Sequence, residues 1–222
     1  MKKNTIKRES TLGYNFKTFV ASAKLAYGLR STNSWFVSQA IPDDISYLGT
    51  RCTMDIGGQE VVYFYNPGVN AVRNCPVAVT LAMANYRTFN VEAVIFVDDL
   101  FMRLSEETKK FVIAHEYGHA ISGHFQKISE DEINWCKKHN IDHEKLVNSN
   151  SAKDQITITK MGNEIRNINY EFEADSVGVK AIGPRQAVRA LAELDAIVPI
   201  VVRSKNFRSE MMKRVDHIKC AM

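Results

Sequence analysis

Apolar and polar residues change their spacing along the chain, and each spacing predicts a type of secondary structure. Residues 16–40 carry an apolar stripe at helical intervals. Gly57-Gly58 predicts a hairpin turn before QEVVYFYN, a β-branched and aromatic run that predicts a strand. The run VEAVIFV at 91–97 predicts a buried strand. Residues 44–56 are ambiguous, and residues 75–86 fit either a strand or a short helix.

Helical patterns dominate the second half of the chain. Ser105 is a favourable N-cap residue, and Glu106 and Glu107 complement the helix dipole, so we predict a helix from there to about Gly123. The polar, turn-rich residues 148–164 predict an exposed loop or hairpin. We also predict a short helix at 130–138, a helix at 165–182 that stops at Gly183-Pro184, a helix from 185 to about 196, and a helical C-terminus with a basic face.

The composition is that of an ordinary globular protein, with 222 residues of which 45% are hydrophobic and 24% charged. The apolar runs are shorter than the roughly 20 residues that a membrane helix needs, and no apolar segment of the secretory type follows the basic N-terminus. We therefore expect a soluble, cytoplasmic protein. The net charge of +4 is modest and comes without a nucleic-acid motif, so we expect no nucleic-acid partner. The oligomeric state is left open.

The four cysteines are scattered along the chain, and none of them belongs to a CxxC pair. A pattern of this kind is typical neither of a disulfide framework nor of a cysteine-rich zinc site. We expect the cysteines to be reduced, without a part in metal binding. They are Cys52, Cys75, Cys136 and Cys220.

The segment FVIAHEYGHAISGH, residues 111–124, places charged and titratable groups on an apolar helix. His115 and His119 lie one turn apart on the same face, so both imidazoles can point at one metal ion. Glu116, next to the first histidine, can take a proton from water at that ion without being a ligand. The pattern H-E-x-x-H therefore predicts a zinc site, with Glu116 as the catalytic base. The alternative is a pair of surface histidines.

A zinc site of this kind needs a third protein ligand. Glu171 and Asp175 share one face of a predicted helix, whereas Glu173 points about 200° away from Glu171. Either glutamate by itself could be a surface acid, but beside an H-E-x-x-H helix we expect Glu171 to be the third ligand. Asp175 would then hydrogen-bond the free ring nitrogen of His119 or of His115 and fix its tautomer.

His124 is a poorer ligand. It follows His115 by nine residues, which is about 180° around the axis if the helix continues. We expect it either to cap the end of the helix, where the dipole favours a charged histidine, or to line the cleft wall.

HEYGHAISGH followed by EFEAD resembles the gluzincin metallopeptidases, in particular the family of the CaaX-processing and heat-shock zinc endopeptidases. The resemblance covers roughly residues 90–195 and implies a zincin-like fold, in which a small mixed or antiparallel sheet packs on the active-site helix. It implies Zn²⁺ as the cofactor and a protein or peptide as the substrate. It also divides the expected single domain, 1–222, into an unassigned part at 1–60, a catalytic core at about 61–196 and a helical C-terminus. Familiar members are embedded in membranes, so this chain would be a soluble minimal catalytic domain.

The expected reaction is hydrolysis of internal peptide bonds. The oxyanion needs a donor besides the metal, and the residues leave four candidates: Tyr170, Arg166, His143 and His124. The strand at 91–97 could form an edge of the cleft, where an extended substrate pairs with it. Two alternatives stay open. One is a repressor-cleaving peptidase of the ImmA/IrrE type, which has a similar signature, and the other is a zinc-binding interaction module that keeps the peptidase fold.

Overall fold

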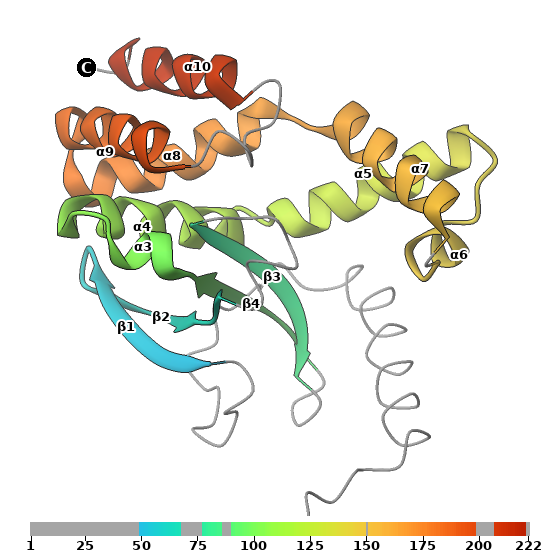
Figure 1. Ribbon diagram of the computed structural model, residues 1–222, viewed down its shortest axis with the longest axis horizontal. Coiled ribbons are helices and arrows are strands. Elements are labelled where there is room, and N and C mark those ends of the chain that lie inside the picture. Colours follow the sequence, from blue (N-terminus) through green and yellow to red (C-terminus); the bar gives the residue numbers. More distant parts are fainter. Residues whose placement is uncertain (1–48, 68–76, 86–89, 150, 199–206, 221–222) are drawn as a thin grey trace, which may run out of the picture.

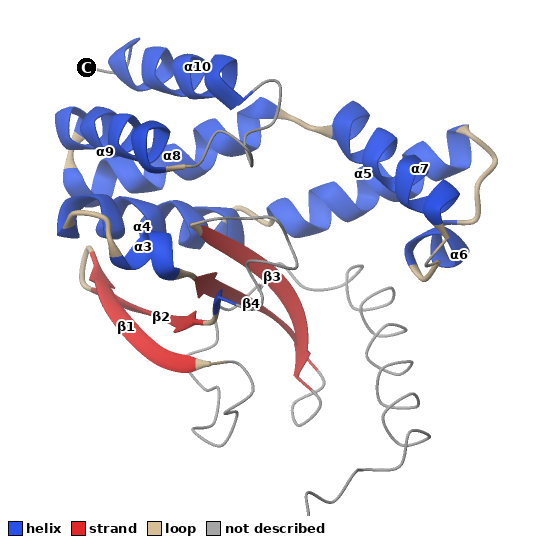
Figure 2. Cartoon of the chain, in the orientation of Figure 1, coloured by secondary structure: helices blue, strands red, loops and turns tan. Residues whose placement is uncertain are grey.

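In the computed structural model a small sheet lies beneath several layers of helices (Figure 1). The structure describes residues 49–67, 77–85, 90–149, 151–198 and 207–220. The helix predicted within residues 16–40 lies outside these ranges. Helix α4 packs on the sheet, α8 and α9 pack on α4, and α10 covers α8 and α9 (Figure 1). Figure 2 shows all the strands on one side of this stack.

The sheet has four strands in the order β1-β2-β4-β3: β1 (Thr50–Ile56), β2 (Gln59–Tyr65), β3 (Ala78–Asn85) and β4 (Asn90–Val97). Strands β1 and β2 form the hairpin predicted at Gly57-Gly58, where both glycines have positive φ, 63° and 89°. Strand β2 pairs with β4 in parallel, and β3 pairs with β4 antiparallel. The sheet is therefore mixed.

The order of the strands corrects one prediction. Strand β4 contains residues 91–97 but lies between β2 and β3, and it pairs with β3 along its length and with β2 at residues 95–97. It is therefore an inner strand and not the edge of the sheet. The edge next to β4 is β3, within the segment 75–86 for which the sequence left strand and helix open.

Eight helices lie within the described ranges: α3 (Asp99–Met102), α4 (Glu106–Ile121), α5 (His124–Lys138), α6 (His143–Val147), α7 (Ala152–Ile165), α8 (Ile168–Ile182), α9 (Pro184–Ile197) and α10 (Phe207–Cys220). The predicted N-cap of α4 is present, since the Ser105 side chain accepts a hydrogen bond from the backbone of Thr108. Pro184 occupies the first turn of α9. Helices α5, α6 and α7 project together from the end of α4 (Figure 1).

The loop predicted at 148–164 is wrong, because most of this segment is helix α7. Ser151 caps the helix through a bond from the Asp154 backbone. Ile158, Met161 and Ile165 share a face that packs on Trp135 and Cys136 of α5. The large apolar residues of α7 are few, and one of them, Ile156, is exposed, so the sequence signal was weak. Contact with α5 stabilises the helix.

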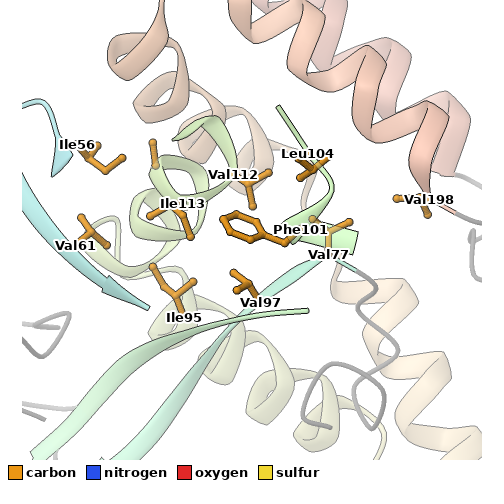
Figure 3. Packing of buried hydrophobic residues seen from close by; sticks show 11 residues of the cluster. Ile56, Val61, Val77, Ile95, Val97, Phe101, Leu104, Val112, Ile113 and Val198 are labelled. Carbon is orange, nitrogen blue, oxygen red and sulfur yellow. The ribbon is translucent and has the colours of Figure 1, made fainter. Parts of the chain in front are cut away.

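The main core lies between the sheet and α4 (Figure 3). Ile95 of β4 and Ile113 of α4 have no exposed surface, and Phe101 of α3 packs with them. Burial of this face fixes how α4 is rotated on the sheet, because turning it would expose Ile113 to water. The α+β fold, with a small mixed sheet on this helix and a mainly helical second half, is as predicted. Within the described ranges, no helix combines the length and apolarity that crossing a membrane requires.

Candidate active site and metal centre

Three side chains from two helices converge between α4 and α8. The Nε2 atoms of His115 and His119 are 3.0 Å apart, and the Glu171 carboxylate lies 3.5 Å from the first and 3.7 Å from the second. Ligands around tetrahedral zinc, bonded at 2.0–2.1 Å, are separated by about 3.3 Å. Two imidazoles and a carboxylate are also a donor set that zinc accepts. These three residues are therefore a group that could hold a metal ion.

Close contact between α4 and α8 brings these residues together. Gly118, inside the H-E-x-x-H segment, faces the Ala174 backbone, and a Cβ at this glycine would be 2.9 Å from the Ala174 Cα. Gly178 lies against the Phe111 ring, where a Cβ would approach within 2.5 Å. The two glycines let the helices approach closely enough for Glu171 to reach the histidines.

The second ring nitrogen of His115 points into a buried polar cluster. Its Nδ1 is 2.9 Å from Oδ1 of Asp175, which has no exposed surface. Of the two histidines that the sequence left open for Asp175, the structure places His115 beside it. Such a carboxylate holds an imidazole in one orientation and one tautomer.

Arg214 completes this cluster, and sequence reasoning missed it. Its Nε and Nη2 lie 2.8 and 2.6 Å from the two oxygens of Asp175, and its Nη1 is 3.3 Å from Glu171. The basic C-terminus suggested a solvated face. Yet Arg214 lies at helical spacing between Met211 and Ile218, both buried, and this position on the apolar face of α10 was a usable signal.

The charges in the cluster shift the pKa values of the two histidines in opposite directions. Burial and the Arg214 charge lower the pKa of His115, but hydrogen bonds to Asp175 and Glu171 outweigh them and raise it to about 9. Burial and the neighbouring His115 lower the pKa of His119 to about 3. Burial raises the pKa of Glu171, but His115 and Arg214 lower it more, so that it lies well below its usual range. The cluster thus favours a proton on His115.

The second ring nitrogen of His119 has a different partner. Its Nδ1 is 2.8 Å from Nδ1 of His124, whose Nε2 is 3.0 Å from Glu173. Helix α4 ends at Ile121, and the positive φ of Gly123, 65°, turns the chain before α5 begins at His124.

The expectation that His124 caps α4 is therefore wrong, because His124 starts the next helix. Its side chain is fully buried, and its expected place in the cleft wall stays a prediction. Burial lowers the pKa of His124, although the hydrogen bond to Glu173 acts in the opposite direction. The lowered pKa disfavours the charged imidazole that a helix cap would use. The premise of a continuous helix failed at Gly123, so His124 faces back toward His119.

Glu116 follows His115 in α4, and its side chain contacts the sheet. The Thr80 hydroxyl of β3 donates to its carboxylate at 2.5 Å. Burial raises the pKa of Glu116, while His115 and the Thr80 hydrogen bond lower it. A carboxylate that is held in place, with a raised pKa, is suited to accept a proton from water. Thr80 was not among the predicted site residues, because it contacts Glu116 only after β3 has packed beside α4.

A family model, Peptidase family M48, matches residues 82–213, which is 132 of the 222 residues and includes the three converging side chains. This chain belongs to peptidase family M48. The membership agrees with the resemblance to gluzincins and makes the protein a metallopeptidase by family. No curated protein and no solved structure matches the chain.

The four residues considered for the oxyanion lie in different parts of this M48 peptidase. Tyr170 stacks on His124 with ring centroids 4.8 Å apart, and its hydroxyl is 3.3 Å from Asp131. Arg166 pairs with Glu210 of α10 at 2.5 Å. His143 lies in α6, 3.5 Å from Glu132. The structure therefore brings His124 into contact with His119 and Tyr170 into contact with His124, and it gives Arg166 and His143 partners elsewhere.

Proposed function

We propose that the protein is a zinc endopeptidase in which His115, His119 and Glu171 hold the metal and Glu116 is the catalytic base. The convergence of the two Nε2 atoms and the Glu171 carboxylate carries this proposal, together with a Glu116 carboxylate close enough to interact electrostatically with His115 and Glu171. A bound zinc ion supplies Lewis acidity, which lowers the pKa of a water molecule toward about 7 and polarises a peptide carbonyl.

Glu116 performs the proton transfers. Its carboxylate takes a proton from the attacking water and returns it to the nitrogen of the leaving amine. Thr80 orients the carboxylate through the hydrogen bond to Oε2. Asp175 holds His115 with its Nε2 toward the metal position, because the bond to Nδ1 fixes the ring. No side chain is assigned to the oxyanion.

Strand β3 is the binding surface that we propose for an extended peptide. It is at the edge of the sheet, and its Thr80 contacts the catalytic base, so a peptide added along it would pass the reacting groups. Such pairing uses backbone hydrogen bonds, which are largely independent of sequence. Pairing of this kind favours a protein or peptide substrate, and it lets the enzyme cleave many different sequences.

The test compares purified protein with Glu116→Gln and Glu171→Ala variants. Elemental analysis should find about one zinc per chain in the wild type and in Glu116→Gln, and less in Glu171→Ala. Hydrolysis of an unfolded protein such as casein should be lost in Glu116→Gln, by about a hundredfold or more. Zinc binding with unchanged hydrolysis in Glu116→Gln would contradict the role of the base. Absence of zinc from wild type purified without chelator would contradict the metal site.

A further inference from the structure

The two proposed histidine ligands have different supporting groups. His115 is held by a buried carboxylate and a partly buried arginine, whereas His119 contacts another histidine. That histidine, His124, has no exposed surface and is clear of the reacting groups, since its second nitrogen faces Glu173. A buried imidazole in this position needs an explanation beyond packing, because an apolar ring would fill the space without the desolvation cost.

The hydrogen bonds allow one assignment of protons when His119 offers Nε2 as a ligand. Its Nδ1 then carries the hydrogen and donates it to Nδ1 of His124, 2.8 Å away. His124 must accept there, so its own hydrogen is on Nε2 and is donated to Glu173 at 3.0 Å. The chain of donors thus runs in one direction, from the ligand to a carboxylate at the surface.

Neighbouring groups hold the His124 ring in this orientation. The Tyr170 ring stacks against it at 4.8 Å and an interplanar angle of 25°. Lys127 pairs with the same Glu173 carboxylate at 3.4 Å and lies 5.5 Å over the Tyr170 ring. Because α5 supplies His124 and Lys127 while α8 supplies Tyr170 and Glu173, the ring is fixed between two helices.

We infer that His124 is a positioning residue that holds His119 in the tautomer and orientation needed for metal binding, as Asp175 does for His115. It is therefore neither a ligand nor a donor to the oxyanion. This inference rests on the proposed function, since it presumes that His119 binds a metal through Nε2. Groups in such a position change metal affinity by about 10- to 100-fold when they are replaced.

Two amide substitutions separate the two hydrogen bonds of His124. In His124→Asn the amide oxygen is bonded to Cγ, as Nδ1 is in histidine. It can therefore take the place of Nδ1 and accept the hydrogen bond from His119. In His124→Gln the amide reaches the place of Nε2 and can donate to Glu173, but it leaves His119 without an acceptor. His124→Phe removes both bonds and keeps a ring. The zinc dissociation constant is measured by competition with a chromophoric chelator, and the visible spectrum of the cobalt(II) form reports on the ligands directly.

Zinc binding should weaken about 10- to 100-fold in His124→Gln and His124→Phe, and less in His124→Asn, which should also keep the wild-type cobalt spectrum. A residue that only filled space would give the opposite order for the two amides, because glutamine is closer to histidine in volume. Affinity in His124→Gln equal to or tighter than in His124→Asn would overturn the inference. Wild-type protein that binds no zinc would overturn the proposed function as well, so the two failures are distinguishable.

Glu173 provides a second test that leaves the buried ring in place, in case substitutions of His124 prevent folding. Its side chain is 49% exposed, so Glu173→Ala should fold normally. It should weaken zinc binding by about tenfold, since His124 loses the acceptor that fixes its own tautomer. Lys180→Ala is the control, because Lys180 is another exposed charged residue of α8 that takes no part in the hydrogen bonds from His119 to Glu173. Equal zinc affinities in the two variants would overturn the inference.

Discussion

Arg214 and Asp175 form a two-point ion pair between α10 and α8, with N–O distances of 2.6 and 2.8 Å. Asp175 is fully buried, and its other contact is Nδ1 of His115. The pair lowers the pKa of Asp175 against the effect of burial and so keeps this carboxylate charged behind the first ligand. The C-terminal helix thereby supports the proposed metal site, although it supplies none of the proposed ligands.

Replacing Arg214 by methionine should destabilise the protein and weaken zinc binding. The substitution leaves the buried Asp175 charge with His115 as its remaining partner, and loss of the arginine should cost up to about 3–5 kcal/mol. Urea unfolding measures the free energy of unfolding, and chelator competition measures the zinc affinity. Arg214→Lys keeps the charge but not the two-point geometry, so it should fall between the wild type and Arg214→Met. The pairing is contradicted if Arg214→Met unfolds at the wild-type urea concentration.

Gly118→Ala should push α4 and α8 apart. The new methyl group would meet backbone atoms of Ala174 at 2.9 and 3.1 Å, and backbone cannot rotate away as a side chain can. We expect a loss of about 1–3 kcal/mol in the free energy of unfolding and weaker zinc binding, because Glu171 moves with α8. Gly162→Ala is the control, since beyond its chain neighbours and the backbone of its own helix no atom lies within 4 Å of a Cβ at this position. It should leave zinc binding unchanged and stabilise α7 by up to about 1 kcal/mol. Equal effects of the two substitutions would refute the close approach.

Zinc affinity should rise with pH up to about pH 9. His115 has a pKa raised to about 9 and must lose its proton before Nε2 can bind a metal. The apparent affinity should therefore increase by up to about tenfold per pH unit between pH 7 and 8 and level off above pH 9. Calorimetry in buffers of different ionisation enthalpy should show about one proton released per zinc at pH 7. An affinity independent of pH between 7 and 8 would contradict this account.

The same pKa determines how the metal-free protein responds to pH. Because the folded pKa of His115 lies above the ordinary value of 6.5, the proton stabilises the fold. This contribution is complete below about pH 6.5 and is lost as the pH rises through about 9. The free energy of unfolding in the presence of chelator should therefore decline over this window, and His115→Gln should reduce the decline.

Thr80→Val should shift the acid limb of the pH–rate profile to higher pH. The threonine hydroxyl lowers the pKa of Glu116, and valine keeps the shape of the side chain without the donor. Glu116 would then become protonated at higher pH, so kcat/KM should fall on the acid side first, with kcat at alkaline pH less affected. Thr80→Ser retains the hydroxyl and should keep the wild-type limb. An unshifted limb in Thr80→Val would mean that the hydrogen bond has no influence on the base.

Much of the fold could be predicted from local pattern. The caps of α4, the hairpin at Gly57-Gly58 and the buried strand at 91–97 each depend on neighbouring residues. Helix α7 was missed because its apolar positions are few and its stability comes from α5. The edge of the sheet was misplaced because the order of strands depends on pairings between distant segments, which periodicity does not report.

The sequence by itself determined the groups that lie within one helix. His115 and His119 are four residues apart, as are Glu171 and Asp175, and the helical period places each pair on one face wherever the helix lies. Only the tertiary structure decided the contacts between elements: Glu171 with the two histidines, Thr80 with Glu116, Arg214 with Asp175, and His124 with His119. The last of these depended on a single left-handed glycine, Gly123, that ends one helix and redirects the next. Short-range geometry follows from backbone sterics, whereas contacts between distant segments follow from how whole faces are buried.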